Sequence, residues 1–321
     1  MNLLLMNPTL QRVFIEPWTE GLPGNAWILL MGFLVAGSCA LVGSYLILRR
    51  MSLVGDAISH SVLPGLAVAF LITRELSPWV MVIGAGAAGI LTTLLIEIIH
   101  SKSRVKVDAA IGITFTTLFA IGVILINLFA GRVHLDTECV LYGELSLIVM
   151  ESPMRVGNWE LPPQPILIMA TVFASILVLI TLFYKELLIS SFDASLAKAM
   201  GLRPKLIHYA LMAIVSVVVV CSFEAVGAVL VVAMLILPGA TALILTDKLP
   251  RVHLLSLFHA LLSTVLGFFL AQWLDVSVAA AMVVAGALLF VTAWFGSPKF
   301  GLISQWLSKN VKDQSESDIV V

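Results

Sequence analysis

Charged residues are scarce in this chain of 321 residues: Asp, Glu, Lys and Arg make up 12% of it, while 60% of the residues are hydrophobic. A water-soluble domain normally carries about a quarter charged residues. So little polar surface cannot cover a soluble body of this length. The composition therefore excludes an ordinary soluble protein and favours lipid as the solvent. The net charge of -1 carries no information about partners, and we expect no nucleic acid among them.

Several chemical motifs are also missing from the sequence. No G-x-x-x-x-G-K-[ST] phosphate loop occurs, so we expect no ATP-binding site on this chain. No H-E-x-x-H occurs, which argues against an intramembrane metalloprotease. The three cysteines, Cys39, Cys139 and Cys221, are scattered. Their spacing favours neither a disulfide framework nor a cysteine metal site.

Long apolar runs are what the sequence does contain. A helix needs roughly 20 apolar residues to cross a bilayer, whereas membrane β-barrels show short alternating segments. The runs here are continuous, so the sequence predicts an all-α, polytopic membrane protein. We place the spans at 26–48, 57–73, 78–99, 109–130, 164–184, 205–223, 225–246, 252–273 and 276–296. The 205–246 region is either a broken helix pair or a re-entrant element, so the count is eight or nine transmembrane helices.

The two ends of the chain differ from its apolar centre. Residues 1–25 form a polar leader, with Glu16 and Glu20 where a signal peptide would have a basic start. Residues 26–298 form the transmembrane domain. Residues 299–321 form a cytoplasmic tail whose last residues, "KDQSESDIVV", are too polar to fold alone, so we expect disorder there.

The basic residues indicate an orientation. Short loops rich in Lys and Arg stay in the cytoplasm. With nine alternating helices, all such segments fall on one side of the membrane, which places the N-terminus outside and the C-terminus inside. These segments are Arg49-Arg50, 102–106, 185–205, 248–251 and 299–312. The longest outer connection, 132–163, is acidic overall.

Ionisable side chains within the apolar runs are the main pointer to function, because each costs at least about 2.5–3.5 kcal/mol at the centre of a membrane helix. The stretch "GDAISHSVLPG" places Asp56 and His60 one helical turn apart, on one face. A carboxylate and an imidazole on one face form half of a site for a divalent transition metal. The alternatives are that Asp56 caps the helix and that His60 makes a hydrogen bond between helices.

Glu224 opens a second apolar stretch, "EAVGAVLVVAMLILPGATA". It completes a mixed oxygen and nitrogen cage if it faces Asp56 and His60; otherwise it is an acid at the outer mouth. We expect His208, close to a basic loop, to lie at the membrane interface. We expect His259 to serve in packing or hydrogen bonding.

The stretch "FDASLAKAMGLRPK" predicts a short helix between two spans. Asp193 caps it over 194–200, Gly201 ends it, and a new element begins at Pro204. This helix is either a knob for a partner protein or an ordinary surface helix. The pairs Pro64-Gly65 and Pro238-Gly239 interrupt two other helices, as bending points or as static kinks.

Four stretches together resemble one family. "RRMSLVGDAISHSVLPGLA" is similar to the signature of the permease subunits of manganese, zinc and iron ABC importers, and "EAVGAVLVVAMLILPGATA" to their second motif. "HLDTECVLYGELSLI" and "FDASLAKAMGL" are similar to the segment after their fourth span and to their coupling-helix region. The resemblance covers residues 27–295. The leader and the outer "ESPMRVGNWELPPQP" depart from the shorter family pattern.

The resemblance implies a fold like the type II ABC importers and no permanent cofactor, with Mn, Zn or Fe as the transported ion in a bacterial inner membrane. It implies a cytoplasmic ATPase dimer, an extracytoplasmic metal-binding protein, and a second permease chain, identical or a sister. It places Asp56, His60 and Glu224 at the metal pathway. In the transport movement that this implies, Pro64, Gly65, Pro238 and Gly239 are possible hinges. Coupling to the ATPase falls on 190–203, through Asp193, Ala194, Leu196, Ala197, Ala199 and Gly201.

Two other classes compete with the importer. A secondary carrier driven by protons or sodium could use Asp56, Glu224 and the histidines as a proton relay, and it would need no ATPase. A membrane enzyme with an Asp56/His60 acid–base pair lacks an evident nucleophile. The ligand types accept Mn, Zn and Fe alike, so the sequence does not choose the metal, nor between a homodimer and a heterodimer.

Overall fold

The structure is a computed structural model that describes residues 16–19, 22–74, 78–129, 145–150, 154–156, 159–297 and 301. The first half of the chain forms α2 (Glu16–Thr19), α3 (Leu22–Leu48), α4 (Val54–Thr73), α5 (Pro78–Lys102) and α6 (Val107–Phe129), then the 3-10 helix η2 (Leu145–Val149) and the paired strands β1 (Met154–Val156) and β2 (Trp159–Leu161). The second half forms α8 (Gln164–Leu182), α9 (Tyr184–Phe192), α10 (Ala194–Ala199), α11 (Pro204–Leu245), α12 (Leu249–Leu274) and α13 (Val278–Gly296).

The predicted all-α membrane architecture is confirmed. Within the described residues, 8 helical segments are long and apolar enough to cross a membrane, and a shorter apolar helix covers Leu230–Leu245. These segments match the predicted spans to within a few residues at most ends. The ninth apolar helix is thus the second part of α11, in the region 205–246 that was predicted to be a broken pair or a re-entrant element.

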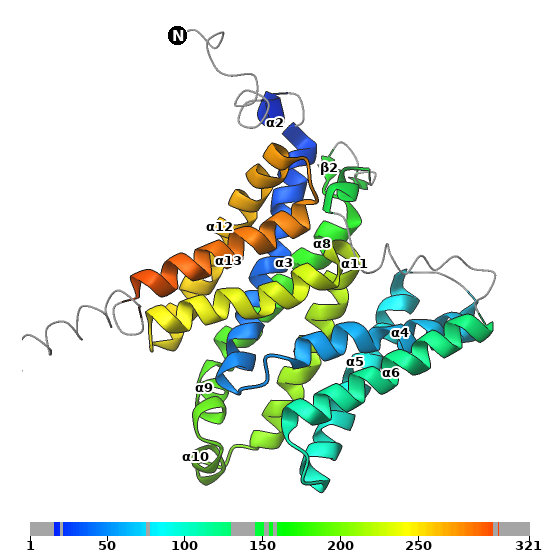
Figure 1. The fold of residues 1–321 in the computed structure, drawn as a ribbon, viewed down its shortest axis with the longest axis vertical. Coiled ribbons are helices and arrows are strands. Elements are labelled where there is room, and N and C mark those ends of the chain that lie inside the picture. Colours follow the sequence, from blue (N-terminus) through cyan, green and yellow to red (C-terminus); the bar gives the residue numbers. More distant parts are fainter. Residues whose placement is uncertain are drawn as a thin grey trace, which may run out of the picture.

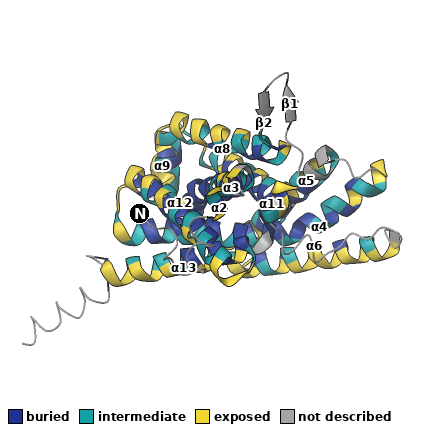
Figure 2. Ribbon diagram, turned by 90° about the horizontal axis from the view of Figure 1, so that it is seen from above, coloured by how far each residue is buried: buried dark blue, intermediate teal, exposed yellow. Residues whose placement is uncertain are grey.

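The helices gather around α3 and α11, which pack extensively on each other. Figure 1 shows α12 and α13 on one side of this pair and α4, α5 and α6 on the other. It also places α9 and α10 at the end of the molecule opposite α2 and β2. Seen from above, the buried residues are concentrated around α3 and α11, and the exposed ones on the outer helices (Figure 2). The centre of the bundle is thus shielded from lipid.

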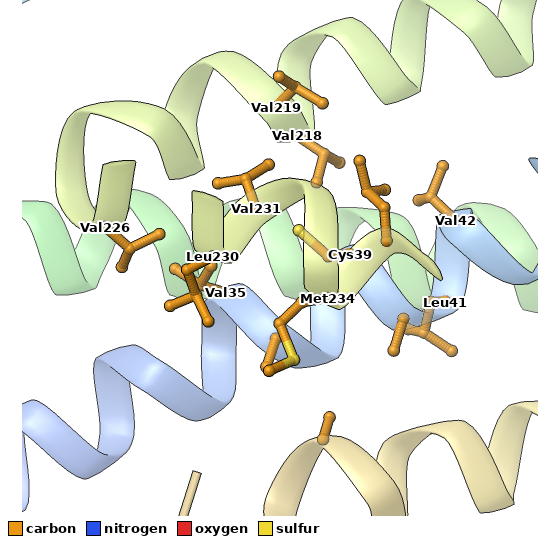
Figure 3. Close-up of a cluster of buried hydrophobic side chains, with 14 of the residues drawn as sticks. Val35, Cys39, Leu41, Val42, Val218, Val219, Val226, Leu230, Val231 and Met234 are labelled. Atoms are coloured by element: carbon orange, nitrogen blue, oxygen red, sulfur yellow. The ribbon is translucent and has the colours of Figure 1, made fainter. Parts of the chain in front are cut away.

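The contact between α3 and α11 forms the main core. Val35, Cys39 and Val42 of α3 are buried against valines of α11, including Val218 and Val231 (Figure 3). Apolar attraction does not by itself hold two helices together in lipid, because the lipid tails are equally apolar. Close van der Waals packing must do so, and small β-branched side chains of this kind allow it.

Glycines set the closest helix crossings. A Cβ at Gly43 of α3 would collide with the backbone carbonyl of Leu235 of α11. In the same way, Gly65 of α4 faces the backbone of Gly84 of α5. Gly65, proposed above as part of a hinge, therefore has a packing role that the sequence did not reveal. Helix contacts through small residues of this type are common in membranes.

The chain breaks inside α11 at Gly227, which has φ 74° and ψ 168°. Only glycine adopts this region at low cost. The chain turns sharply there, and the segment from Val226 to Met234 leads back along the core (Figure 3). The predicted broken helix pair is confirmed.

The short helix α10 forms as predicted. The Asp193 carboxylate accepts hydrogen bonds from the backbone N–H of Ser195 (2.8 Å) and Leu196 (3.0 Å). At the other end Gly201 has φ 80°, and the N–H groups of Gly201 and Leu202 donate to the carbonyls of Lys198 and Ala197. These two hydrogen bonds form a Schellman C-cap. α11 then begins at Pro204, as predicted.

The remaining predicted boundaries fall largely outside the described residues. These are most of the polar leader, most of the 132–163 outer loop and nearly all of the tail from 299 onward. Where the leader is described, α2 and the first turns of α3 are helical, so α3 begins at Leu22, before residue 26.

The backbone of Gly227 leads to a first prediction. Gly227→Ala should lower the free energy of unfolding by about 1–3 kcal/mol, because alanine is strained in this conformation. Thermal unfolding of the detergent-solubilised protein checks this. Gly112→Ala is the matched control: a Cβ there meets nothing within 4 Å, and removing a helical glycine should be neutral or stabilising by about 0.5–1 kcal/mol. Equal melting temperatures for both variants would contradict the prediction.

The cap of α10 leads to a second prediction. The N–H groups of Leu196 and Ser195 hold the pKa of the Asp193 carboxyl below its ordinary value. Asp193→Ala should therefore speed hydrogen exchange at the amides of α10, whereas Asp193→Asn, which also caps helices, should leave it nearly unchanged.

The pH dependence of this cap follows from the sign of the shift. Because the folded-state pKa is lowered, the stabilisation is complete above the ordinary aspartate pKa and is lost as pH falls through the lowered value. Exchange measured across acidic pH and corrected for the intrinsic rate checks this. If the amides of α10 were equally protected from exchange in the wild type and in Asp193→Ala at neutral pH, the proposed stabilisation by the cap would be refuted.

Candidate metal-ion site

Asp56 and His60 lie on one face of α4, in its first two turns. Asp56 Oδ1 and His60 Nε2 are 3.4 Å apart, and the two side chains are 37% and 33% exposed. The pair is thus neither sealed in the core nor fully open. The carboxylate also sits in the first turn of the helix, where the helix dipole favours a negative charge.

The helix-cap alternative for Asp56 is wrong. The N-cap of α4 is Leu53, and no side chain caps the helix there. The carboxylate is therefore available to a ligand or to His60.

The separation of the two atoms fits a shared cation. Transition metals bind carboxylate oxygen and imidazole nitrogen at about 2.0–2.2 Å. Two such ligand atoms 3.4 Å apart subtend an angle of about 108° at an ion 2.1 Å from each. This angle is close to that between neighbouring ligands in a tetrahedral site. The pair can therefore hold two corners of a metal site without moving its backbone.

The ring of His60 is held by α6. Its centroid lies 5.8 Å from that of Phe115 and 6.1 Å from that of Phe119, the second in an edge-on arrangement. These contacts restrict the ring and leave Nε2 directed at Asp56. The alternative role, a hydrogen bond from His60 to another helix, is not found among the described contacts.

The third proposed ligand, Glu224, is only partly described. Its backbone is helical and lies three residues before the break at Gly227, while its side chain lies outside the described part of the chain. Among described side chains, no group of three or more His, Cys, Asp and Glu gathers at one point. The role of Glu224 therefore stays a prediction.

Both prolines proposed as hinges lie inside continuous helices. α4 runs on through Pro64, and α11 runs on through Pro238. Neither proline interrupts its helix; the break that the structure contains is at Gly227. Pro64 nevertheless lacks the N–H that would bond the carbonyl of His60, so an oxygen acceptor lies next to the pair. Whether either proline bends during transport stays a prediction.

Three other histidines of the described residues have structural partners. His259 Nε2 lies 3.1 Å from the carbonyl of Gly286, as predicted for a hydrogen-bonded residue. His253, which the sequence analysis did not single out, lies 3.2 Å from the Tyr45 hydroxyl. His208 lies at the beginning of α11, between Arg49 and Glu97. None of these rings faces Asp56.

The segment proposed for coupling presents apolar side chains at the end of the bundle. Ala197 is buried, while Phe192, Leu196 and Met200 are 62%, 50% and 60% exposed. These residues lie outside the candidate membrane spans. Exposed apolar side chains that lipid does not cover are typical of a protein interface.

Comparison with known proteins places the whole bundle in one family. The model of the ABC 3 transport family matches residues 25–297. The manganese transport system membrane protein MntD of Bacillus subtilis is 45% identical over 283 residues, which cover 88% of this chain and 95% of MntD. The zinc transport system membrane protein TroD of Treponema pallidum is 42% identical over 280 residues, 87% of this chain and 76% of TroD.

A solved structure agrees with this assignment. PsaBC from Streptococcus pneumoniae, in complex with a Fab, has a chain that superposes with a TM-score of 0.74 and 34% identity, covering 92% of this chain and 98% of that one. The family model, over residues 25–297, spans the bundle from α3 to α13, including the helix that carries Asp56 and His60. This chain is therefore a multi-pass membrane protein of the ABC 3 transport family.

Proposed function

We propose that the chain is the membrane-spanning subunit of an ATP-driven importer that moves a divalent transition-metal ion, Mn, Zn or Fe, into the cytoplasm. The observation that carries this is the Asp56–His60 pair. It places an oxygen and a nitrogen ligand 3.4 Å apart on one face of a membrane helix. The relatives named for manganese and zinc transport support the same class of substrate.

The chemistry of the Asp56–His60 pair suits a metal ion in transit better than a permanently bound one. A carboxylate offsets part of the charge of an ion that has lost its water, and an imidazole favours a transition metal over Mg²⁺ or Ca²⁺. Two protein ligands leave the other coordination positions to water or to groups that approach from other helices. An ion held in this way can leave again, which a structural metal site does not allow.

ATP hydrolysis belongs, in this proposal, to a cytoplasmic ATPase dimer that grips α10. The apolar side chains around α10 lie at the end of the bundle opposite α2 and β2. The segment 185–205, which contains α10, carries four Lys and Arg residues: Lys185, Lys198, Arg203 and Lys205. The positive-inside rule places that end in the cytoplasm. The N-terminus and the β1–β2 hairpin then lie on the outer side of a bacterial inner membrane.

The transport cycle follows from this arrangement. An extracytoplasmic binding protein docks on the outer face and delivers the ion to Asp56, His60 and, as predicted, Glu224. ATP binding moves the ATPases, and α10 passes that movement to the spans. This permease and a second permease chain rock from an outward-open to an inward-open state. The ion then leaves because the inward-open state holds it more weakly.

The pair provides the test of this function. Asp56→Asn keeps the volume of the side chain but removes its charge, and His60→Phe keeps ring contacts with Phe115 and Phe119 but removes the nitrogens. Each should lower the initial rate of metal uptake roughly tenfold or more, since loss of even an outer partner of a metal ligand weakens binding by that amount. The assay offers Mn²⁺, Zn²⁺ and Fe²⁺ separately to vesicles that contain the permease, its ATPase and its binding protein.

Asp108→Asn is the control. Asp108 is also in the first turn of a membrane helix, α6, and is exposed. This variant loses the same favourable interaction with a helix dipole but touches no proposed ligand. Uptake near the wild-type rate in both pair variants, at equal amounts of assembled complex, would remove Asp56 and His60 from the pathway. Uptake by the permease without its ATPase would favour a secondary carrier instead.

A further inference from the structure

Arg49 makes an unusual set of contacts for a residue at the end of a membrane helix. It directly follows α3, and its side chain is half-buried, whereas that of Arg50 is exposed. Arg49 Nη2 donates to Ser190 Oγ at 2.8 Å, and Nε donates to Ser191 Oγ at 3.1 Å. Nη1 lies 3.4 Å from His208 Nδ1. All three nitrogens of the guanidinium group therefore contact other helices, α9 and α11.

The contact with His208 fixes the state of that ring. Arginine has only donors, so His208 Nδ1 must accept. A neutral ring then carries its proton on Nε2, which lies 3.7 Å from Glu97 Oε2 of α5. A doubly protonated ring would set two donors and two positive charges against each other at Nδ1. Donors and acceptors therefore alternate along a chain of contacts from the serines of α9, through Arg49 and His208, to Glu97 of α5.

The position of Arg49 in the chain gives these contacts a mechanical meaning. On one side, Ser190 and Ser191 lie in the last turn of α9, and only Asp193 separates α9 from α10. On the other side, a short connection leads from Arg49 to the start of α4 at Val54 and to Asp56. Arg49 therefore stands between the helix proposed to grip the ATPase and the helix that carries the metal pair.

A second contact stiffens α3 next to Arg49. Tyr45, one turn earlier on α3, is fully buried, and its hydroxyl lies 3.2 Å from His253 Nε2 of α12. The rings of Tyr45 and His253 also pack at 5.1 Å. The end of α3 is thus anchored in the bundle, so a force applied to Arg49 through α9 is not absorbed by fraying of α3.

We propose that Arg49 is a positioning residue of the transport cycle, which clamps α9 to the corner between α3 and α4 and so transmits movement of α10 to Asp56 and His60. This rests on the proposed function. Arginine suits the role because its planar fork bonds several partners at once in a fixed geometry, which a lysine cannot do. Loss of the clamp should leave the ATPase working while transport lags behind it.

The test measures metal uptake and ATP hydrolysis in the same proteoliposomes, which contain the permease, its ATPase and its binding protein, with Mn²⁺ and Zn²⁺ supplied separately. In Arg49→Ala the number of ions moved per ATP should fall roughly fivefold or more, the scale of a typical coupling energy between sites. ATP hydrolysis should stay within about twofold of wild type, since no ATPase contact is altered. Arg49→Lys should restore only part of the ratio.

Two further variants separate this role from a general loss of folding. Ser190→Ala/Ser191→Ala removes both acceptors on α9 with little change in volume, and it should lower the ratio in the same direction. Arg50→Ala removes the exposed neighbouring charge and should change neither activity. If Arg49→Ala fails to assemble, the serine pair alone decides.

The outcomes are distinct. A wild-type ratio in Arg49→Ala or, at full assembly, in the serine pair overturns the clamp. A fall of uptake and hydrolysis in equal proportion in the serine pair also overturns it, because that result indicates a structural role alone. Absence of uptake in the wild-type complex would instead refute the proposed function, irrespective of Arg49.

Discussion

The functional half of the bundle depends on the position of Leu235. Its carbonyl lies against Gly43 of α3, where any side chain would collide with it, and its own side chain lies against Gly55 of α4. Leu235 thus occupies the corner between the end of α3 and the start of α4. It reaches that corner because α11 breaks at Gly227 and turns back into the core. Leu235 thereby packs α3, the helix that ends just before Arg49, against the first turn of α4, which carries Asp56.

The fold could be predicted from the sequence because lipid allows few alternatives. A membrane-spanning segment must satisfy its backbone hydrogen bonds internally, so an apolar run of sufficient length is a helix. The break in α11 was predicted only as one of two readings, since a glycine in an apolar run is ordinary. The interruptions assigned to Pro64 and Pro238 were wrong. A membrane helix can continue through a proline, because neighbouring helices and local adjustments compensate for the missing hydrogen bond. At Pro238, the Ser256 hydroxyl of α12 donates to the proline's own carbonyl at 3.3 Å, a contact that ties α12 to α11 there.

The candidate site was predictable to the extent that it lies on one helix. Asp56 and His60 share a face because of their spacing, and the structure places them within contact distance. The rings of Phe115 and Phe119 that orient His60 come from another helix, and no spacing rule reveals them. Arg49 was counted as one of a pair of cytoplasmic charges. The difference in role between Arg49 and Arg50 is visible only when α9 and α11 are in place. The two residues are of the same type and differ only in how far they are buried.

A site of two ligands on one rigid helix constrains how transport can work. Asp56 and His60 are one turn apart, so they move together and their mutual geometry hardly changes between states. A ligand shifts an equilibrium only through its different affinity for the two states. The change in metal affinity must therefore come from groups that approach or leave α4, on α6 or α11, or from a change in access to water. Energy supplied at α10 has to move α4 relative to those helices. The contact of Arg49 with Ser190 and Ser191 joins the end of α9, next to α10, to the connection that leads into α4.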